Sequence, residues 1–226
     1  MYVFQFQQIT PYWPALLHGF LQTLLLSGWS SALSLAIVLA AYIIRFSVPP
    51  SLRPSVNALI RVYIDIMQAL PVLVGLVWLY FGLPLLGLEL SPDFAAILVL
   101  GTSFSAFALD LFMGAELAIS REQVHVGTIH GMTTATAAAR LYVPTIARAT
   151  VDPFVGQIVT VLKLSTFASV IGSQEILSIA NGIIATTYRP LETYSLVALV
   201  FVVAIVPVNL IRRFATHRAA QRGEIG

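Results

Sequence analysis

Five apolar stretches, each long enough to cross a lipid bilayer, constrain this chain more than any other feature. They cover about residues 15–44, 58–86, 93–118, 153–172 and 192–211. A helix needs roughly 20 apolar residues to cross the hydrocarbon core, and backbone polar groups find no water there. Only 10% of the 226 residues are charged, against roughly 25% in soluble domains. The sequence therefore predicts an all-α integral membrane protein with five transmembrane helices.

Arginine residues divide the segments outside these spans into two unequal sets. If the N-terminus is outside, Arg189 alone falls outside, and the inside set is Arg45, Arg53, Arg61, Arg121, Arg140, Arg148, Arg212, Arg213, Arg218 and Arg222. Basic residues stay on the cytoplasmic side of membranes. We therefore predict an outside N-terminus and an inside C-terminus.

This orientation also predicts the domain organisation. Residues 1–14 form an outside or interfacial segment, residues 15–213 form a single transmembrane domain, and residues 214–226 form a cytoplasmic tail.

The polar segment of residues 120–148, between spans three and four, is predicted to lie in the cytoplasm. Ser120 with Gln123 matches the capping box that opens a helix. Gly131 suits the left-handed conformation that ends one, because glycine has no side chain to clash. The pattern predicts a short helix that stops at this glycine.

A second short helix is expected after the glycine. Thr133 or Thr134 can cap its start, and it should stop before Pro144. Two short helices of this kind suit the docking of a partner protein. An ordinary amphipathic linker at the membrane surface is the alternative.

Several segments, taken in chain order, resemble one family of transport proteins. They are YIDIMQALPVLVGLVWLYFGLPLLG (Tyr63–Gly87), SAFALDLFMGAE (Ser105–Glu116), VLKLSTFASVIG (Val161–Gly172) and TYRPLETYSLVALV (Thr187–Val200). With Gly131 and the later Pro144 in the loop, they resemble the membrane subunits of ABC importers. The branch is that of polar amino-acid uptake, which includes histidine and glutamine permeases, and the resemblance covers roughly residues 15–215.

The chain also departs from the family pattern. The glutamate of the family's cytoplasmic loop falls at His125, and its two alanines fall at Val126 and Gly127. An arginine of the family's second span is replaced by Gln68. The chain therefore resembles a divergent member, and these differences leave its substrate open.

The resemblance implies a set of partners. They are two copies of an ATPase subunit, a second permease subunit that is a related but different chain, a periplasmic solute-binding protein and membrane lipid, without nucleic acid. It also implies a multi-pass location in a bacterial inner membrane and ATPase coupling through the cytoplasmic loop. The coupling residues would be Gln123, His125, Val126, Gly127, His130, Gly131 and Met132. For Gly131, a plain helix stop is the alternative.

Energy for transport is expected to come from a partner. The chain has no Gly-x-x-x-x-Gly-Lys-Ser/Thr phosphate loop, so we expect no enzymatic activity, and ATP and Mg²⁺ would bind the ATPase. A self-contained secondary carrier or channel subunit is the alternative function, although such carriers tend to have more spans built as repeats. A non-transporting scaffold is a third.

Polar residues within the spans are candidates for the substrate pathway. Charge at bilayer depth is costly and is commonly paired or turned toward a cavity. The candidates are Gln68, Pro71, Lys163, Ser165, Thr166 and Ser169. Lys163 could meet the carboxylate of an amino acid. Alternatively, it pairs with Asp65 or Asp110, or reaches a headgroup.

The two intramembrane acids, Asp65 and Asp110, are predicted to be structural partners of Arg61, Arg121 or Lys163. Pro71 lacks a backbone N–H and should kink span two.

The four histidines, His18, His125, His130 and His217, do not form a ligand spacing with carboxylates. We therefore predict no metal site and no cofactor in this chain.

Overall fold

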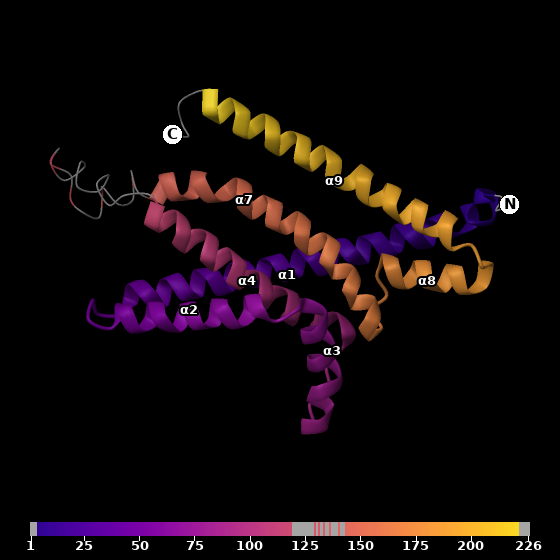
Figure 1. Cartoon of the computed structure of the whole chain (residues 1–226), viewed down its shortest axis with the longest axis horizontal. Coiled ribbons are helices and arrows are strands. Elements are labelled where there is room, and N and C mark those ends of the chain that lie inside the picture. Colours follow the sequence, from indigo (N-terminus) through magenta and orange to yellow (C-terminus); the bar gives the residue numbers. More distant parts are fainter. Residues whose placement is uncertain are drawn as a thin grey trace.

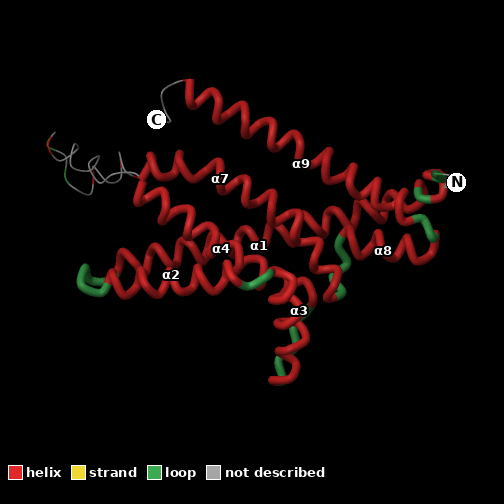
Figure 2. Tube along the Cα trace, in the orientation of Figure 1, coloured by secondary structure: helices red, strands yellow, loops and turns green. Residues whose placement is uncertain are grey.

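The computed structural model describes residues 4–118, 129, 131, 133, 136, 140 and 143–221. Its long helices are α1 (Trp13–Ser47), α4 (Pro92–Ala118), α7 (Val143–Leu164) and α9 (Pro190–Gln221). Its shorter helices are α2 (Arg53–Ala69), α3 (Val72–Gly82) and α8 (Ile176–Thr187). Turns of 3-10 helix are η1 (Phe6–Gln8), η2 (Thr10–Tyr12), η3 (Leu83–Leu86) and η5 (Ser165–Ile171). Figure 1 shows their arrangement, and Figure 2 shows that short loops connect them in the described parts.

Among the described residues, four helical stretches are long and apolar enough to cross a membrane. They are Phe6–Ser47, Pro92–Glu116, Arg148–Ile171 and Pro190–Phe214. The pair of helices α2 and α3 passes the same test when it is counted as one broken span. This confirms the predicted all-α membrane fold, with four candidate spans, or five when the bent pair is counted as one.

The second span differs from the prediction of a single kinked helix. Its two helices, α2 and α3, meet at an angle of 94°. Leu70 and Pro71 between them both have extended backbones, because the proline ring disfavours a helical conformation in the residue before it. Figure 1 shows α3 leaving the bundle at this point. Pro71 therefore breaks the span instead of bending it.

Two other boundaries differ from the prediction, and one helix was not predicted. α7 begins at Val143, inside the predicted loop, and contains Pro153, which was expected to start the span. α9 continues to Gln221, well into the predicted tail. The apolar helix α8 was not predicted, because its 12 residues are too few to cross a bilayer.

The centre of the bundle is the contact between α1 and α4. Val38 of α1 packs against Ala106, Ala108 and Leu109 of α4, and Ile64 of α2 joins the same cluster. Small residues let membrane helices approach closely, and close packing is the main force between helices in lipid.

The two ends of the bundle hold different parts of the chain. At one end lie the connection between α1 and α2 and the C-terminal ends of α4 and α9 (Figure 1). We call this the inner end, because the arginines that were predicted to be cytoplasmic gather on these elements. The N-terminal segment and the connection between α8 and α9 form the outer end.

The outer end has its own apolar core. Ile9 and Leu16 pack with Ile176 and Ala180 of α8 and with Val197 of α9. The core cluster therefore joins the N-terminal segment to both α8 and α9.

Candidate functional site

Two irregular points of the membrane-spanning helices meet in one region of the bundle. Val72, at the start of α3, and Leu164, at the end of α7, both pack against the buried cluster of Leu100, Phe104 and Val161. The break of the second span therefore lies near the point where α7 changes into η5. The predicted pathway residues lie in or next to these two interruptions; they are Gln68, Pro71, Lys163, Ser165, Thr166 and Ser169. We call this region the junction.

The hydroxyl groups of the junction are bound to nearby carbonyl oxygens. Ser165 donates to Leu162 at 2.9 Å, Thr166 to Lys163 at 2.7 Å and Ser169 to Thr166 at 2.8 Å. Ser165 is fully buried, whereas the other two are partly exposed. Thr166 and Ser169 are therefore the hydroxyl side chains of this set that reach the surface.

Lys163 is exposed on the surface of the single chain, as are Asp65 and Gln68. Within the described ranges neither Lys163 nor Asp65 has an ion pair. The suggested pairing of Lys163 with either intramembrane acid is therefore wrong. Asp110 instead accepts a 2.9 Å hydrogen bond from Arg61. This pair is one of those that the sequence predicted.

These exposed polar groups have a physical consequence in a membrane. A charged side chain within a span is too costly to leave against lipid tails. It must face water, another subunit or a headgroup. The exposed side chains of Lys163, Asp65 and Gln68 are therefore unsuited to contact with the hydrocarbon.

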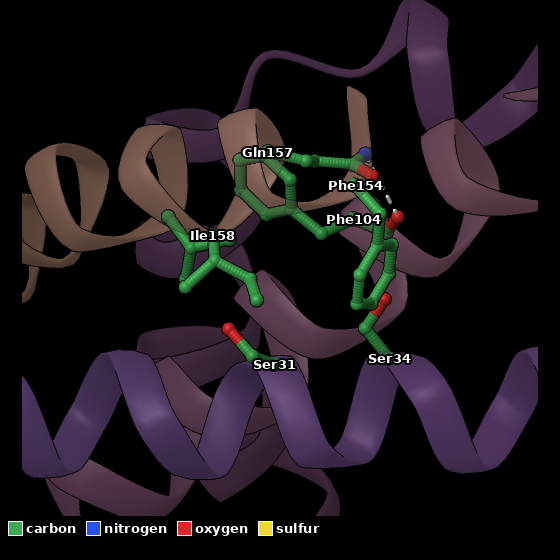
Figure 3. Close-up of a pocket in the computed structure, with 7 residues that line it drawn as sticks. Ser31, Ser34, Phe104, Phe154, Gln157 and Ile158 are labelled. Atoms are coloured by element: carbon green, nitrogen blue, oxygen red, sulfur yellow. Dashed lines mark hydrogen bonds between the residues drawn. The ribbon is translucent and has the colours of Figure 1, made fainter. Parts of the chain in front are cut away.

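A small cleft lies between α1, α4 and α7 (Figure 3). Its lining side chains are Ser31, Ser34, Phe104, Phe154, Gln157, Ile158 and Val161. Gln157 donates from Nε2 to the carbonyl oxygen of Phe104 at 3.3 Å, and its buried Oε1 has no partner in the described part of the chain. The cleft has room for about one water molecule. It is too small to hold an amino acid.

Part of the predicted coupling segment can be compared with the structure. Gly131 has φ +82°, which confirms its predicted left-handed backbone. The hydroxyl oxygen of Thr133 accepts from the backbone N–H of Thr136 at 3.2 Å, the bond of a helix cap. The other predicted coupling residues lie outside the described residues; they are Gln123, His125, Val126, Gly127, His130 and Met132.

Two ion pairs at the inner end were not anticipated. Arg45 of α1 forms a bidentate ion pair with Glu116 of α4. Arg212 of α9 forms another with Asp152 of α7. The sequence contained a signal for both, since each residue lies near a predicted inner helix end. In the prediction, Arg45 and Arg212 served only to orient the chain.

A buried acid at the base of α8 was also missed. Glu175 caps this helix by accepting from the backbone N–H groups of Leu177 and Ser178, each at 2.9 Å. Thr23 of α1 donates to the same carboxylate at 3.5 Å. Burial raises the pKa of the Glu175 carboxyl to about 7. These bonds fix the start of α8 against α1.

Metal binding has no support in the described residues. No group of three His, Asp or Glu side chains gathers there in a way that could hold an ion.

The fold and the sequence together define the class of protein. Residues 35–222 match the family described as "Binding-protein-dependent transport system inner membrane component". The match covers most of the chain, and the chain therefore belongs to this family of membrane components.

Individual relatives agree with this membership. The chain is 27% identical over 204 residues to a Vibrio harveyi chain described as "Probable amino-acid ABC transporter permease protein PatM", covering 88% of each. It is 25% identical over 224 residues to the glutamine transport system permease protein GlnP of Escherichia coli strain K12, covering 98% of this chain and 99% of the relative.

A solved structure has the same fold. It is described as the crystal structure of an amino acid ABC transporter with histidines, and one of its chains matches with a TM-score of 0.84 at 22% identity. The match covers 96% of this chain and 100% of that one.

Proposed function

We propose that this chain is the permease subunit of an ATP-driven importer for amino acids or related small polar solutes. The names of relatives such as GlnP and PatM support this substrate class. The subunit would lie in a bacterial inner membrane, with its outer end toward the periplasm, and would form half of the translocation pathway.

The junction is the observation that carries the proposal. It joins the break between α2 and α3 to the transition from α7 to η5, and exposed Lys163 and Gln68 lie on the adjoining helix ends. Interrupted helices are tolerated at membrane depth where they line a water-filled cavity or contact protein. A second permease subunit would supply the opposite wall. Each span then places its polar groups toward the pathway instead of toward lipid.

Lys163 would attract the carboxylate of a passing solute. Ionic attraction is strong in surroundings of low dielectric constant, so a single ammonium group can orient a zwitterion. Gln68, Thr166 and Ser169 would offer further hydrogen bonds, and Pro71 would maintain the break. Ser165 is buried in this conformation, so it would reach the pathway only if η5 rearranged.

The energy would come from two copies of an ATPase subunit that bind ATP and Mg²⁺. They would dock on the segment of residues 120–148, and a periplasmic binding protein would deliver the solute to the outer end. Closure of the ATPases would then push this segment as a rigid body and switch the bundle between two packings.

Two variants test these roles in the reconstituted complex. Lys163→Met should raise the solute concentration for half-maximal uptake about tenfold, which corresponds to a loss of about 1.4 kcal/mol of binding. Unchanged uptake would remove Lys163 from the pathway.

Gly131→Leu should lower uptake per ATP hydrolysed while the complex still assembles, because the left-handed backbone at this position disfavours a side chain. Normal uptake would leave Gly131 as a plain helix stop.

The solute itself is best identified on the binding protein. Purified binding protein should carry an amino acid or a related zwitterion that mass spectrometry can detect. A bound sugar or metal ion would overturn the proposed substrate class.

A further inference from the structure

α9 has less contact with the rest of the chain than the other unbroken spans have. Only 11% of its most apolar window is buried, against 61% for α4. Its outer half packs through Val197 and Val200 into the core of the outer end. Toward its C-terminal end it diverges from α1 (Figure 1). Apolar packing therefore anchors α9 mainly at the outer end.

The inner half of α9 is attached to α7 by a specific polar contact. Arg212 donates from Nε and Nη2 to the two carboxylate oxygens of Asp152, at 2.9 and 3.0 Å. The same Nη2 donates to the backbone carbonyl oxygen of Asp152 at 2.8 Å. Two parallel bonds between a guanidinium and a carboxylate fix direction as well as distance. The contact therefore sets the register of α9 on α7.

Gly156 of α7 makes room for this contact. A Cβ atom at this position would lie 2.8 Å from Nη1 of Arg212 and 2.9 Å from Nη2. These distances are too short for unbonded atoms, so the guanidinium, which is the flexible end of its side chain, would have to shift from its observed position. Gly156 therefore leaves the space in which the guanidinium meets Asp152.

We propose that the contact between Arg212 and Asp152 makes α9 follow α7 during the transport cycle. This inference rests on the proposed function, in which residues 120–148 receive the push of the ATPases. α7 begins within that segment, at Val143, and therefore moves with it. Arg212, Asp152 and Gly156 are positioning residues, because they pass movement between helices and do not touch the solute.

The other two inner ion pairs do not have this role. Arg45 and Glu116 join α1 to α4, which already pack along the centre of the bundle. Arg61 and Asp110 join α2 to α4, and their side chains are 43% and 46% exposed. Their contact therefore adds little stiffness to the bundle. The contact of α9 differs because little apolar packing backs it up.

The first test compares uptake with ATP hydrolysis in the reconstituted complex. Asp152→Asn removes the charge, whereas Gly156→Ala keeps both charges and displaces the guanidinium. Both should lower the amount of solute taken up per ATP hydrolysed by about fivefold or more. A fivefold change is at the lower end of the coupling that is typical between two sites of a protein. Arg61→Gln is the matched control, since it removes an interhelix arginine from the same end of the bundle, and it should leave the ratio unchanged.

The second test measures the movement itself. The chain has no cysteine, so Val151→Cys on α7 and Phe214→Cys on α9 give two unique sites for spin labels. Both native side chains are exposed. With the contact intact, the distance between the labels should stay narrow and constant with and without ATP. With Gly156→Ala it should broaden, because α9 no longer follows α7.

The two measurements separate the inference from the function on which it rests. Unchanged uptake per ATP in both variants, or a narrow distance distribution in Gly156→Ala, would overturn the role of the contact. If the unaltered complex hydrolyses ATP without transporting any solute, the proposed function fails. The label distances would still show whether the contact holds α9 to α7.

Discussion

The two ends of the bundle hold their helices together in different ways. At the inner end, arginines pair with carboxylates across helices; the pairs are Arg45–Glu116, Arg61–Asp110 and Arg212–Asp152. At the outer end, buried carboxylates accept hydrogen bonds from backbone N–H groups. Glu175 binds the first turn of α8, and Glu192 binds the N–H of Gln5 at 3.0 Å.

This difference bears on movement. The Glu192 carboxylate ties the N-terminal segment to α9 through the backbone N–H of Gln5. The bonds of Glu175 to Leu177 and Ser178 order the start of α8, and Thr23 joins that start to α1. An exposed ion pair with a single hydrogen bond, such as Arg61–Asp110, can stretch or exchange partners when helices slide. The bidentate contact between Arg212 and Asp152 instead keeps its two helices together while they move. We infer that the outer end acts as the fixed part of the subunit and that the inner end is the part that would move with the proposed ATPase partner.

The largest effect is expected when the best-shielded inner pair is broken. The side chains of Arg45 and Glu116 are each 13% exposed, and the rings of Tyr42 and Phe46 lie beside the guanidinium. Glu116→Ala should cost about 3 kcal/mol of unfolding free energy, because it removes the carboxylate that compensates a largely buried guanidinium. Denaturation in detergent micelles measures this loss. A cost near zero would contradict the shielding of the pair.

The outer end should show a pH dependence that comes from Glu175. Burial raises the pKa of this carboxyl from 4.5 to about 7, so the folded chain holds the proton more tightly than the unfolded chain. Stability should therefore fall as the pH rises from about 4.5 to about 7 and level off above, by up to roughly 3 kcal/mol in total.

Glu175→Gln isolates this effect, because it keeps an oxygen that can cap α8 but does not titrate. Its stability should stay level over the same pH range, as followed by thermal melting. The partners of Glu175 in the structure are Thr23 and two backbone N–H groups, none of which titrates there. If the melting temperatures of the two proteins changed with pH in the same way, Glu175 would not be the source of the pH dependence.

A smaller loss is expected from Thr23, whose hydroxyl accepts the backbone N–H of Ile176 at 3.2 Å. Thr23→Val leaves this buried N–H without its acceptor and should cost about 1.5 kcal/mol. Thr23→Ser retains the hydroxyl and should lose less. Equal melting temperatures for the two variants would show that the bond does not hold α8.

The smallest effect should come from the exposed pair at the inner end. Arg61→Gln is expected to change the unfolding free energy by less than about 1 kcal/mol, since water screens exposed pairs. The same denaturation assay applies. A loss as large as that of Glu116→Ala would mean that the exposure of an inner ion pair does not determine how much it stabilises the fold.

The sequence predicted features that depend on local chemistry or on depth in the membrane. The apolar spans followed from their length, and Arg61 was one of the three partners predicted for the two intramembrane acids. The left-handed backbone of Gly131 followed from its lack of a side chain.

Other features depend on tertiary packing and were beyond such reasoning. Pro71 marked where the second span is interrupted, but the 94° angle depends on how α3 packs. The contact between Arg212 and Asp152 needed the rotation of two helices about their axes, which depth alone does not provide. Lys163 was correctly seen as an unusual charge, yet its lack of an ion pair among the described residues required the structure.

The central claim is that this subunit transports solute only when partners supply the energy. Proteoliposomes should contain the chain with its second permease and ATPase, with the solute-binding protein added outside. We predict accumulation of the solute against its gradient when ATP is present inside, and none when either the ATPase or ATP is omitted. Accumulation by the chain alone, driven by an ion gradient, would contradict the account and favour a self-contained carrier.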